Sequence, residues 1–474
     1  MAIRDMKLCF DCLRFRRERD EARREVKRLK EENRRLREKL DCAHRTILEA
    51  PFGSSTPSSK QPVKAKTTAE RQARKGGART GHKGRGRQTT SRRPTLPTET
   101  VAVPQACPNC GGRLELPSIR TRTLLSCQPP QPVTRSVDVQ EAWCPDCHKT
   151  IRPRTPGAFP RMFLDNSALA YVAVEHYLHG QTLGRLAQIT GVHKGTLTNA
   201  MHFLADLLAP GLEGVQQRLR LAAVIFADET VWRNDGDNGY AWMFRTGDCV
   251  LYRFCDTRSG EVPRSILGTD FLRGVLVTDR YAGYNGILMA RQFCYAHLLR
   301  DLQDIERQFP DVPEVAAFVA HLAPLLSDAM ALRREARNRA QYRCRARRLK
   351  ARIQRAIRRP ARHPAVQSYQ DIFRQHRDKL YHWVDDPDVP PDNNTAERGL
   401  RPTVIARKLS FGSQSKRGAS TREILMSIIG TISLRTHDPW RTLRDALDRL
   451  AASSSPPEDI GSILFPSVPS ANAA

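Results

Sequence analysis

Apolar and small residues recur at helical spacing near the start of the chain, within residues 12–47. They alternate spacings of three, four and seven residues, at Phe15, Ala22, Val26, Leu29, Asn33, Leu36, Leu40, Ala43 and Ile47. This repeat is typical of a coiled coil. Asn33 falls on an a position, where a buried Asn often fixes a parallel dimer in register. A single surface helix is the alternative, but the pattern favours a coiled coil and a homodimer or larger assembly.

A second helical region covers residues 167–208 and contains the segment TLGRLAQITGVHKGTLTNAM. Ala187 is small where two helices would cross, and Gly191 follows four residues later, where the connecting turn needs a positive φ. The segment therefore predicts a helix-turn-helix. Its second helix would carry outward polar side chains that can reach base edges or phosphates, namely His193, Lys194, Thr196, Thr198 and Asn199. An ordinary helical hairpin is the alternative.

The hydrophobic pattern becomes strand-like at residue 222. AAVIFAD is a short apolar run that ends at Asp228, and GVLVTD ends at Asp279, with WMFRTG and VLYRFCDT between them. Helical sequence follows over roughly 287–382, and a further helix is expected to start near Asn394. Strands followed by helices predict a layered α/β or α+β domain.

The net charge of the chain indicates what kind of partner it binds. The chain has 474 residues, with 78 Lys and Arg against 50 Asp and Glu, which is a formal net charge of +28. Such an excess indicates a polyanion, and nucleic acid is the usual one, so DNA contact is favoured for the helix-turn-helix. No apolar run approaches the roughly 20 residues of a spanning helix, and the first residues hold no apolar h-region, so we expect no signal peptide. We therefore expect no membrane partner and a cytoplasmic, nucleoid-associated protein.

Two segments concentrate the positive charge. Residues 60–93 hold twelve Lys or Arg and one acid among scattered glycines, a composition that cannot build a core. This arm could neutralise phosphates or enter a minor groove, and its candidate DNA contacts are Lys83, Arg85 and Arg87. A solvated basic linker is an equally good interpretation. Residues 331–362 hold fourteen Lys or Arg and one acid, and they predict a helix with one buried stripe and a cationic face.

Four cysteines form two C-x-x-C pairs, Cys107 with Cys110 and Cys144 with Cys147. Four thiolates in two pairs match a closed tetrahedral zinc site, so one structural Zn²⁺ in a zinc-ribbon-like module is predicted. The gap between the pairs is longer than in common ribbons. A third pair near the N-terminus has no partners within reach along one helix, and we interpret it as packing residues.

Three carboxylates form a candidate catalytic and metal site: Asp228, Asp279 and Glu397. The two Asp residues end apolar strands, and carboxylates at strand ends share one rim of an α/β sheet. Glu397 would lie in the first turn of a helix. Phosphoryl transfer on DNA uses two Mg²⁺ or Mn²⁺ ions, which take hard oxygen ligands. Taken singly, each acid could instead cap a helix, and Asn394 with Glu397 fits a capping box. The neighbouring Arg398 and Arg401 could orient Glu397 or bind the scissile phosphate, and we favour the phosphate for at least one of them.

Several longer motifs resemble one family of proteins. The runs FADETVWRN, GVLVTDRYAGYN and DNNTAERGLRPTVIARKLSFGS, together with CPNCGG, CPDC, FGSSTPSSKQP and GHKGRGR, resemble the insertion sequence 66 family of bacterial transposases. The resemblance covers roughly residues 10–440, and the three acidic motifs are highly specific. Two places depart from the commoner pattern. Arg280 stands where Gly is frequent, and CYAHLLRDL replaces a more basic segment around Cys294 and His297.

The resemblance implies a ribonuclease-H-like catalytic domain with a DDE triad at Asp228, Asp279 and Glu397, interrupted by a helical segment between the second and third acids. It implies a DNA transposase that cleaves and joins double-stranded DNA at element terminal repeats and target DNA. Accessory proteins of the same element are possible partners. A non-catalytic DNA-binding regulator explains the charge but not the three acids, and a metal-dependent nuclease would use the same site.

Together these elements predict a multidomain α+β protein. The expected parts are a coiled coil at 1–50, a basic arm at 51–100, a zinc module at 101–155, a helix-turn-helix region at 156–215, a catalytic domain at 216–440 with a helical insertion at about 300–385, and a C-terminal helix with a loose tail at 441–474.

Overall fold

The computed structural model describes residues 17–33, 132–139, 142–146, 148–151, 154–453 and 460–465. Residues 17–33 are helical, as the heptad pattern predicts, and Val26 and Leu29 are about half exposed, at 51% and 47%. Pairing of this helix with a second copy stays a prediction. Lys83, Arg85 and Arg87 of the basic arm lie outside the described residues.

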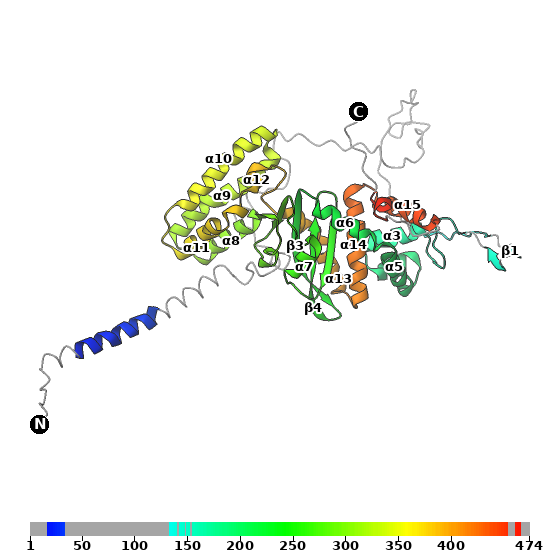
Figure 1. The fold of residues 1–474 in the computed structure, drawn as a ribbon, viewed down its shortest axis with the longest axis horizontal. Helices are drawn as coiled ribbons and strands as arrows, with labels where there is room; N and C mark the ends of the chain where they lie inside the picture. Colours follow the sequence, from blue (N-terminus) through cyan, green and yellow to red (C-terminus); the bar gives the residue numbers. More distant parts are fainter. Residues whose placement is uncertain are drawn as a thin grey trace, which may run out of the picture. The chain divides into compact units, whose positions relative to one another are not determined.

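A five-stranded mixed sheet forms the centre of the fold (Figure 1). Its strands are β3 (Val224–Asn234), β4 (Asp237–Arg245), β5 (Val250–Cys255), β6 (Val275–Thr278) and β7 (Ala290–Phe293). The spatial order is β5-β4-β3-β6-β7. The first three strands are antiparallel, whereas β3, β6 and β7 are parallel. The mixed α+β class predicted from the sequence is therefore confirmed.

The β3–β4 hairpin corrects one expectation. The apolar run was expected to end at Asp228, but β3 continues to Asn234 because β4 pairs with it over its whole second half. A two-residue turn makes this possible: Asp235 and Gly236 both have positive φ, at 53° and 87°. That geometry matches the right-handed twist of a tight hairpin. Strand β7 is also new, because it falls within sequence that was expected to be helical.

Helix α14 (Lys416–Arg435) protects the outer edge of the sheet. Strand β5 is an edge strand, whose unpaired N–H groups are a liability. Alternate amides of β5 donate to side chains one helical turn apart on α14: Val250 to Thr431 at 3.1 Å, Tyr252 to Ser427 at 2.9 Å and Phe254 to Glu423 at 2.9 Å. These three polar side chains of α14 therefore satisfy the strand amides that a sixth strand would otherwise pair with.

Further helices pack around α14 and the sheet. They are α3 (Asn166–Tyr177), α4 (Leu183–Thr190), α5 (Lys194–Leu208), α6 (Gly211–Arg220), α7 (Glu261–Leu267), α13 (Asn394–Ser410) and α15 (Pro439–Ala452). Helix α13 lies against β3 and β4, while α3, α5 and α6 pack on α14 (Figure 1). The short helix α16 (Ile460–Leu464) packs against α6, with Ile460 and Leu464 buried. This part of the C-terminus differs from the loose tail that we predicted.

A helical unit separates β7 from α13 and has its own hydrophobic core. It consists of α8 (Tyr295–Gln308), α9 (Pro313–Glu335), α10 (Arg339–Arg358), α11 (Pro364–Gln375), η3 (Arg377–Lys379) and α12 (His382–Asp385). Among the described helices, α9 alone has the length and apolar composition to cross a membrane. The sequence pattern did not lead us to expect such a helix. However, α9 packs against α8, α10 and α11 and supplies the centre of this core.

Candidate active site

Asp228 lies in the middle of the central strand. It is 3% exposed, and its Oδ1 accepts the backbone N–H of Glu229 at 3.0 Å. Because β3 continues past it, Asp228 does not cap a helix. The parallel register pairs Val224 with Val275 and Phe226 with Val277. The same offset brings Asp228 level with Asp279 on the neighbouring strand.

Asp279 directly follows β6, as the sequence predicts, and it is 7% exposed. Its Oδ1 accepts the backbone N–H of Tyr281 at 2.9 Å. Burial, and after it the nearby charge of Glu229, raise the pKa of Asp279 to about 7, against the opposing effects of the Tyr281 N–H, Arg258 and Arg291. A second, fully buried carboxylate therefore acts on the candidate triad acid.

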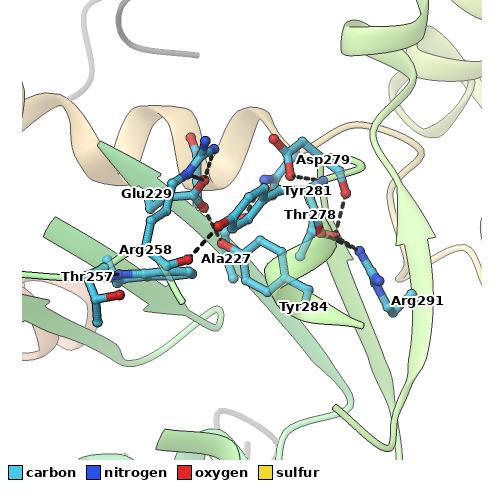
Figure 2. A network of polar contacts seen from close by, with 12 residues as sticks. Ala227, Glu229, Thr257, Arg258, Thr278, Asp279, Tyr281, Tyr284 and Arg291 are labelled. Carbon is cyan, nitrogen blue, oxygen red and sulfur yellow. Dashed lines mark hydrogen bonds and ion pairs between the residues drawn. The ribbon is translucent and has the colours of Figure 1, made fainter. Parts of the chain in front are cut away.

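That second carboxylate, Glu229, was missed by the sequence reasoning. Its Oε1 forms an ion pair with Arg258, whose Nε lies at 3.0 Å, and its Oε2 accepts the hydroxyl of Tyr284 at 2.6 Å. Figure 2 shows Glu229, Arg258, Tyr284 and Asp279 in one network with Tyr281. The Arg258 guanidinium lies 3.8 Å from the centroid of the Tyr281 ring. Nothing in the local pattern singles out Glu229, because its partners come from other segments.

This network holds the loop that follows Asp279. The Tyr281 hydroxyl donates to the carbonyl of Arg258, and the Trp242 ring packs edge-on against Tyr284 at 5.7 Å. Glycine is required at position 283, where a Cβ atom would collide with the Tyr281 ring. The motif Tyr-Ala-Gly-Tyr is thus explained by packing. Arg280, which departs from the commoner family residue, forms an ion pair with Asp301 of α8 at 2.6 Å.

Hydrogen bonds through Asn393 and Cys294 bring the element that carries Glu397 to the same region. The Asn393 side chain donates to the carbonyl of Ala227 at 2.8 Å, next to Asp228. The Asn393 N–H donates to Cys294 Sγ at 3.1 Å, and the Cys294 N–H donates to the carbonyl of Thr278 at 2.9 Å, next to Asp279. The start of α13 is therefore joined to β3 and, through Cys294, to β6.

Glu397 itself does not form the capping box that the sequence allowed. The N-cap of α13 is Asn393 and makes no side-chain capping bond, and Asn394 is the first helical residue. Glu397 Oε1 is buried without a hydrogen-bond partner, and the nearest cation, Arg300, is an ion-pair contact at 4.0 Å. Burial raises the pKa of Glu397, while Arg300 lowers it and Asp392 raises it. Glu397 therefore lacks the hydrogen bonds that a purely helix-capping role would require.

The three acids lie on adjoining elements without forming one compact cluster. Within the described ranges, no group of three His, Cys, Asp or Glu side chains is gathered closely enough to hold a metal ion. Arg398 and Arg401 are exposed on α13, and their charges act on Glu397. The site residues thus remain a prediction that the arrangement of the elements favours.

The other predicted sites are only partly described. Cys144 is the last residue of β1 (Ala142–Cys144), which pairs with the antiparallel β2 (Lys149–Ile151). Cys107, Cys110 and Cys147 lie outside the described residues, so the zinc site stays a prediction.

Helices α4 and α5 are joined by a three-residue turn in which Gly191 has a φ of 67°. His193 caps α5 through the N–H of Gly195, whereas Lys194, Thr196 and Asn199 are exposed and Thr198 is partly buried.

Comparison with known proteins agrees with the sequence resemblance. A family model described as Transposase IS66 family matches residues 161–421, which is more than half of the chain. The chain is 23% identical over 419 residues to the uncharacterized protein y4jD of Sinorhizobium fredii, covering 78% of this chain and 81% of that protein. It is also 23% identical over 397 residues to the uncharacterized protein y4hP of the same organism, covering 74% and 71% of the two chains.

Proposed function

The chain belongs to the IS66 family of transposases, and on that premise we propose that it cleaves and joins DNA ends through a DDE triad of Asp228, Asp279 and Glu397. The strand order supports a ribonuclease-H-like catalytic domain. Three antiparallel strands are extended by two parallel ones, and β3, the first strand of this sheet along the chain, is its central strand. The first acid lies on that strand, the second follows the adjacent parallel strand, and the third comes after the helical insertion.

The chemistry of the three carboxylates fits divalent metal ions. Mg²⁺ and Mn²⁺ take hard oxygen ligands. Two observations favour a cation here: the pKa of Asp279 is raised by burial and by Glu229, and Glu397 Oε1 is buried without a hydrogen-bond partner. When bound, two such ions would promote attack on a scissile phosphate and departure of the leaving group. Asp228, Asp279 and Glu397 would hold them.

The surrounding residues would position the site and the DNA. Glu229, through Arg258 and Tyr284, holds the loop that begins at Asp279. Arg398 and Arg401 are exposed beside Glu397 and can form charge-assisted hydrogen bonds to a scissile phosphate. None of these roles requires the side chains to change protonation state.

Helix α10 provides a second argument for a polyanionic partner. It contains no acidic residue, and its buried stripe is Tyr342, Ala346, Leu349, Ile353, Ala356 and Ile357. Its exposed face carries Arg343, Arg347, Arg348, Arg352, Arg355 and Arg358. Such a row of like charges repels itself unless a polyanion neutralises it. We assign this face to phosphates of double-stranded DNA, alongside the outward residues of α5 and the basic arm.

The proposal also retains the predicted auxiliary parts. One structural Zn²⁺ bound by Cys107, Cys110, Cys144 and Cys147 would stabilise the module before α3, and the N-terminal helix would pair with a second copy. The DNA partner would be the element ends and target DNA, with accessory proteins of the same element as further partners.

The observation that carries the proposal is Glu397, whose Oε1 is buried without a hydrogen bond, on a helix tied to both Asp-bearing strands. Glu397→Gln keeps the shape and should abolish single-turnover cleavage of donor-end DNA in Mg²⁺ while the melting temperature stays within a few degrees. Asp270→Asn removes an exposed acid from the loop before β6, whereas Asp279 follows the other end of that strand. This variant is the control and should cleave like the parent.

Other results would change the proposal in defined ways. If Glu397→Gln cleaves within a few-fold of the parent, Glu397 is not a ligand, and Asp392, whose Oδ1 accepts the N–H of Asn394 at 3.1 Å, becomes the third candidate. Cleavage without joining to target DNA would identify a nuclease. Specific binding without any cleavage by the parent in Mg²⁺ or Mn²⁺ would identify a DNA-binding regulator.

A further inference from the structure

An open groove of about 480 Å³ lies where the α3–α4 connection, the first turn of α5 and the turn between α13 and α14 meet. Its cationic side chains are Lys194 and Arg422, and no Asp or Glu is among its lining residues. Glycines 180, 184, 412 and 418 are among its lining residues. The groove is thus positively charged and roomy enough for a polar group larger than a water molecule.

Arg422 is a buried cation without a counter-charge. It is 8% exposed, and within the described part of the chain no carboxylate forms an ion pair with it. One of its terminal nitrogens lies 3.2 Å from Nε2 of His176, and its guanidinium lies 5.4 Å and 5.3 Å from the Tyr177 and Trp232 rings. A guanidinium stays protonated in proteins, and burying an unpaired charge is costly. Arg422 is therefore arranged to receive an anion.

The partner of Arg422 cannot supply that anion. Burial, together with the positive charge of Arg422, lowers the pKa of His176 to about 4, so this imidazole is neutral near pH 7. It also contacts the carbonyl of Gln181 through Nδ1 at 2.6 Å. His176 thus orients the guanidinium without compensating its charge.

Three helices begin at the groove. Thr182 caps α4, His193 caps α5 just before Lys194, and Ser415 caps α14. Each cap occupies one first-turn amide, on Arg185, Gly195 and Gly418 respectively, and leaves others available. The first-turn N–H groups and the helix dipole both favour an anion at a helix start. Their convergence adds to the charge of Arg422 and Lys194.

The turn between α13 and α14 is held in place before any ligand binds. The Trp232 indole donates to Ser413 Oγ at 3.1 Å, and the Ser413 N–H donates to the carbonyl of Arg233 at 2.9 Å. Gly412 is required there, because a Cβ atom would collide with the Arg233 carbonyl. One wall of the groove is therefore rigid and fixed to the β3–β4 hairpin.

We propose that this groove binds a backbone phosphate of DNA, with Arg422 and Lys194 as its charged ligands and the starts of α4 and α14 as amide donors. The identification of this phosphate as part of DNA rests on the proposed function. A phosphate seated here would join α4 and α5 to the turn that follows the helix of Glu397. DNA held at α5 would then be fixed relative to the catalytic helix.

The first experiment measures phosphate binding by the full chain in EDTA. Melting temperatures are compared in sodium phosphate and in NaCl of equal ionic strength, at about ten times the apparent Kd, where a rise of roughly 1–2 °C is expected. Part of that rise is a general salt effect. Arg422→Gln should lose the specific part, and Lys194→Gln, at an exposed position, should weaken the apparent Kd several-fold. Lys408→Gln, an exposed lysine of α13 outside the groove, should respond like the parent.

The outcomes distinguish two questions: whether the groove binds phosphate at all, and whether the bound phosphate belongs to DNA. If Arg422→Gln and Lys194→Gln both keep the full phosphate response, the site is overturned; if Arg422→Gln does not fold, Lys194→Gln alone decides. Saturating the protein with a short duplex should remove the response to inorganic phosphate. If the response to inorganic phosphate is undiminished with DNA bound, the bound phosphate does not belong to DNA, and a free phosphate compound is the ligand. Because no metal or cleavage is involved, loss of the proposed catalytic function would leave these results unchanged.

Discussion

Asp279→Asn tests the charge balance of the candidate active site in one step. Asn keeps the shape and can accept the Tyr281 N–H, but it removes the ionisable group. In the parent, a pKa raised from 3.8 to about 7 disfavours the charged carboxylate in the folded protein. A shift of about 3 pKa units corresponds to at most roughly 4 kcal/mol, because each unit is worth about 1.4 kcal/mol.

The pH dependence follows from the direction of this shift. Below about pH 4, Asp279 is protonated in both the folded and the unfolded chain and has no effect on stability. As pH rises toward 7, the unfolded chain ionises first, so the parent loses stability; above the folded pKa the loss is complete. Asp279→Asn should therefore be more stable than the parent in EDTA at pH 8, and the advantage should be roughly 2–3 kcal/mol smaller at pH 5.

The assay is chemical denaturation of both proteins at pH 5 and pH 8, in EDTA and in Mg²⁺. Mg²⁺ should stabilise the parent at pH 8 and leave Asp279→Asn unaffected, because the variant has lost a ligand. Asp270→Asn, which removes one exposed charge, should show neither effect. The reasoning is refuted if Asp279→Asn is less stable than the parent at pH 8 in EDTA, or if its advantage does not depend on pH.

Three further predictions concern the parts outside the triad. Cys144→Ser should release about one Zn²⁺ per chain and loosen the 101–155 module, and full zinc retention would contradict the four-cysteine site. Deleting residues 1–50 should lower the assembly mass in solution, and an unchanged mass would exclude the coiled coil as the dimer contact. Lys194→Ala should weaken binding to all DNA sequences and reduce the salt slope by about one ion, whereas Asn199→Ala should relax sequence preference; unchanged binding by both would count against DNA contact at α5.

Much of the local structure could be predicted from the sequence, because burial on one side of an element leaves a periodic pattern. The strand before Asp279 and the helix that starts at Asn394 were predicted and are present. The cationic helix with a buried stripe is α10. The family was also recognisable, since the three acidic motifs are long and specific.

The tertiary structure decided the features whose partners come from distant segments. Strand β3 runs past Asp228 because β4 pairs with it there. The end of the strand predicted from the local apolar run was therefore wrong. Glu229 is part of the candidate site because Arg258 and Tyr284 reach it from 29 and 55 residues away. Arg422 is buried without a counter-charge beside His176, 246 residues away in the chain. Periodicity reports only whether a position is buried, whereas the electrostatics of a buried charge depend on which side chains the fold brings against it.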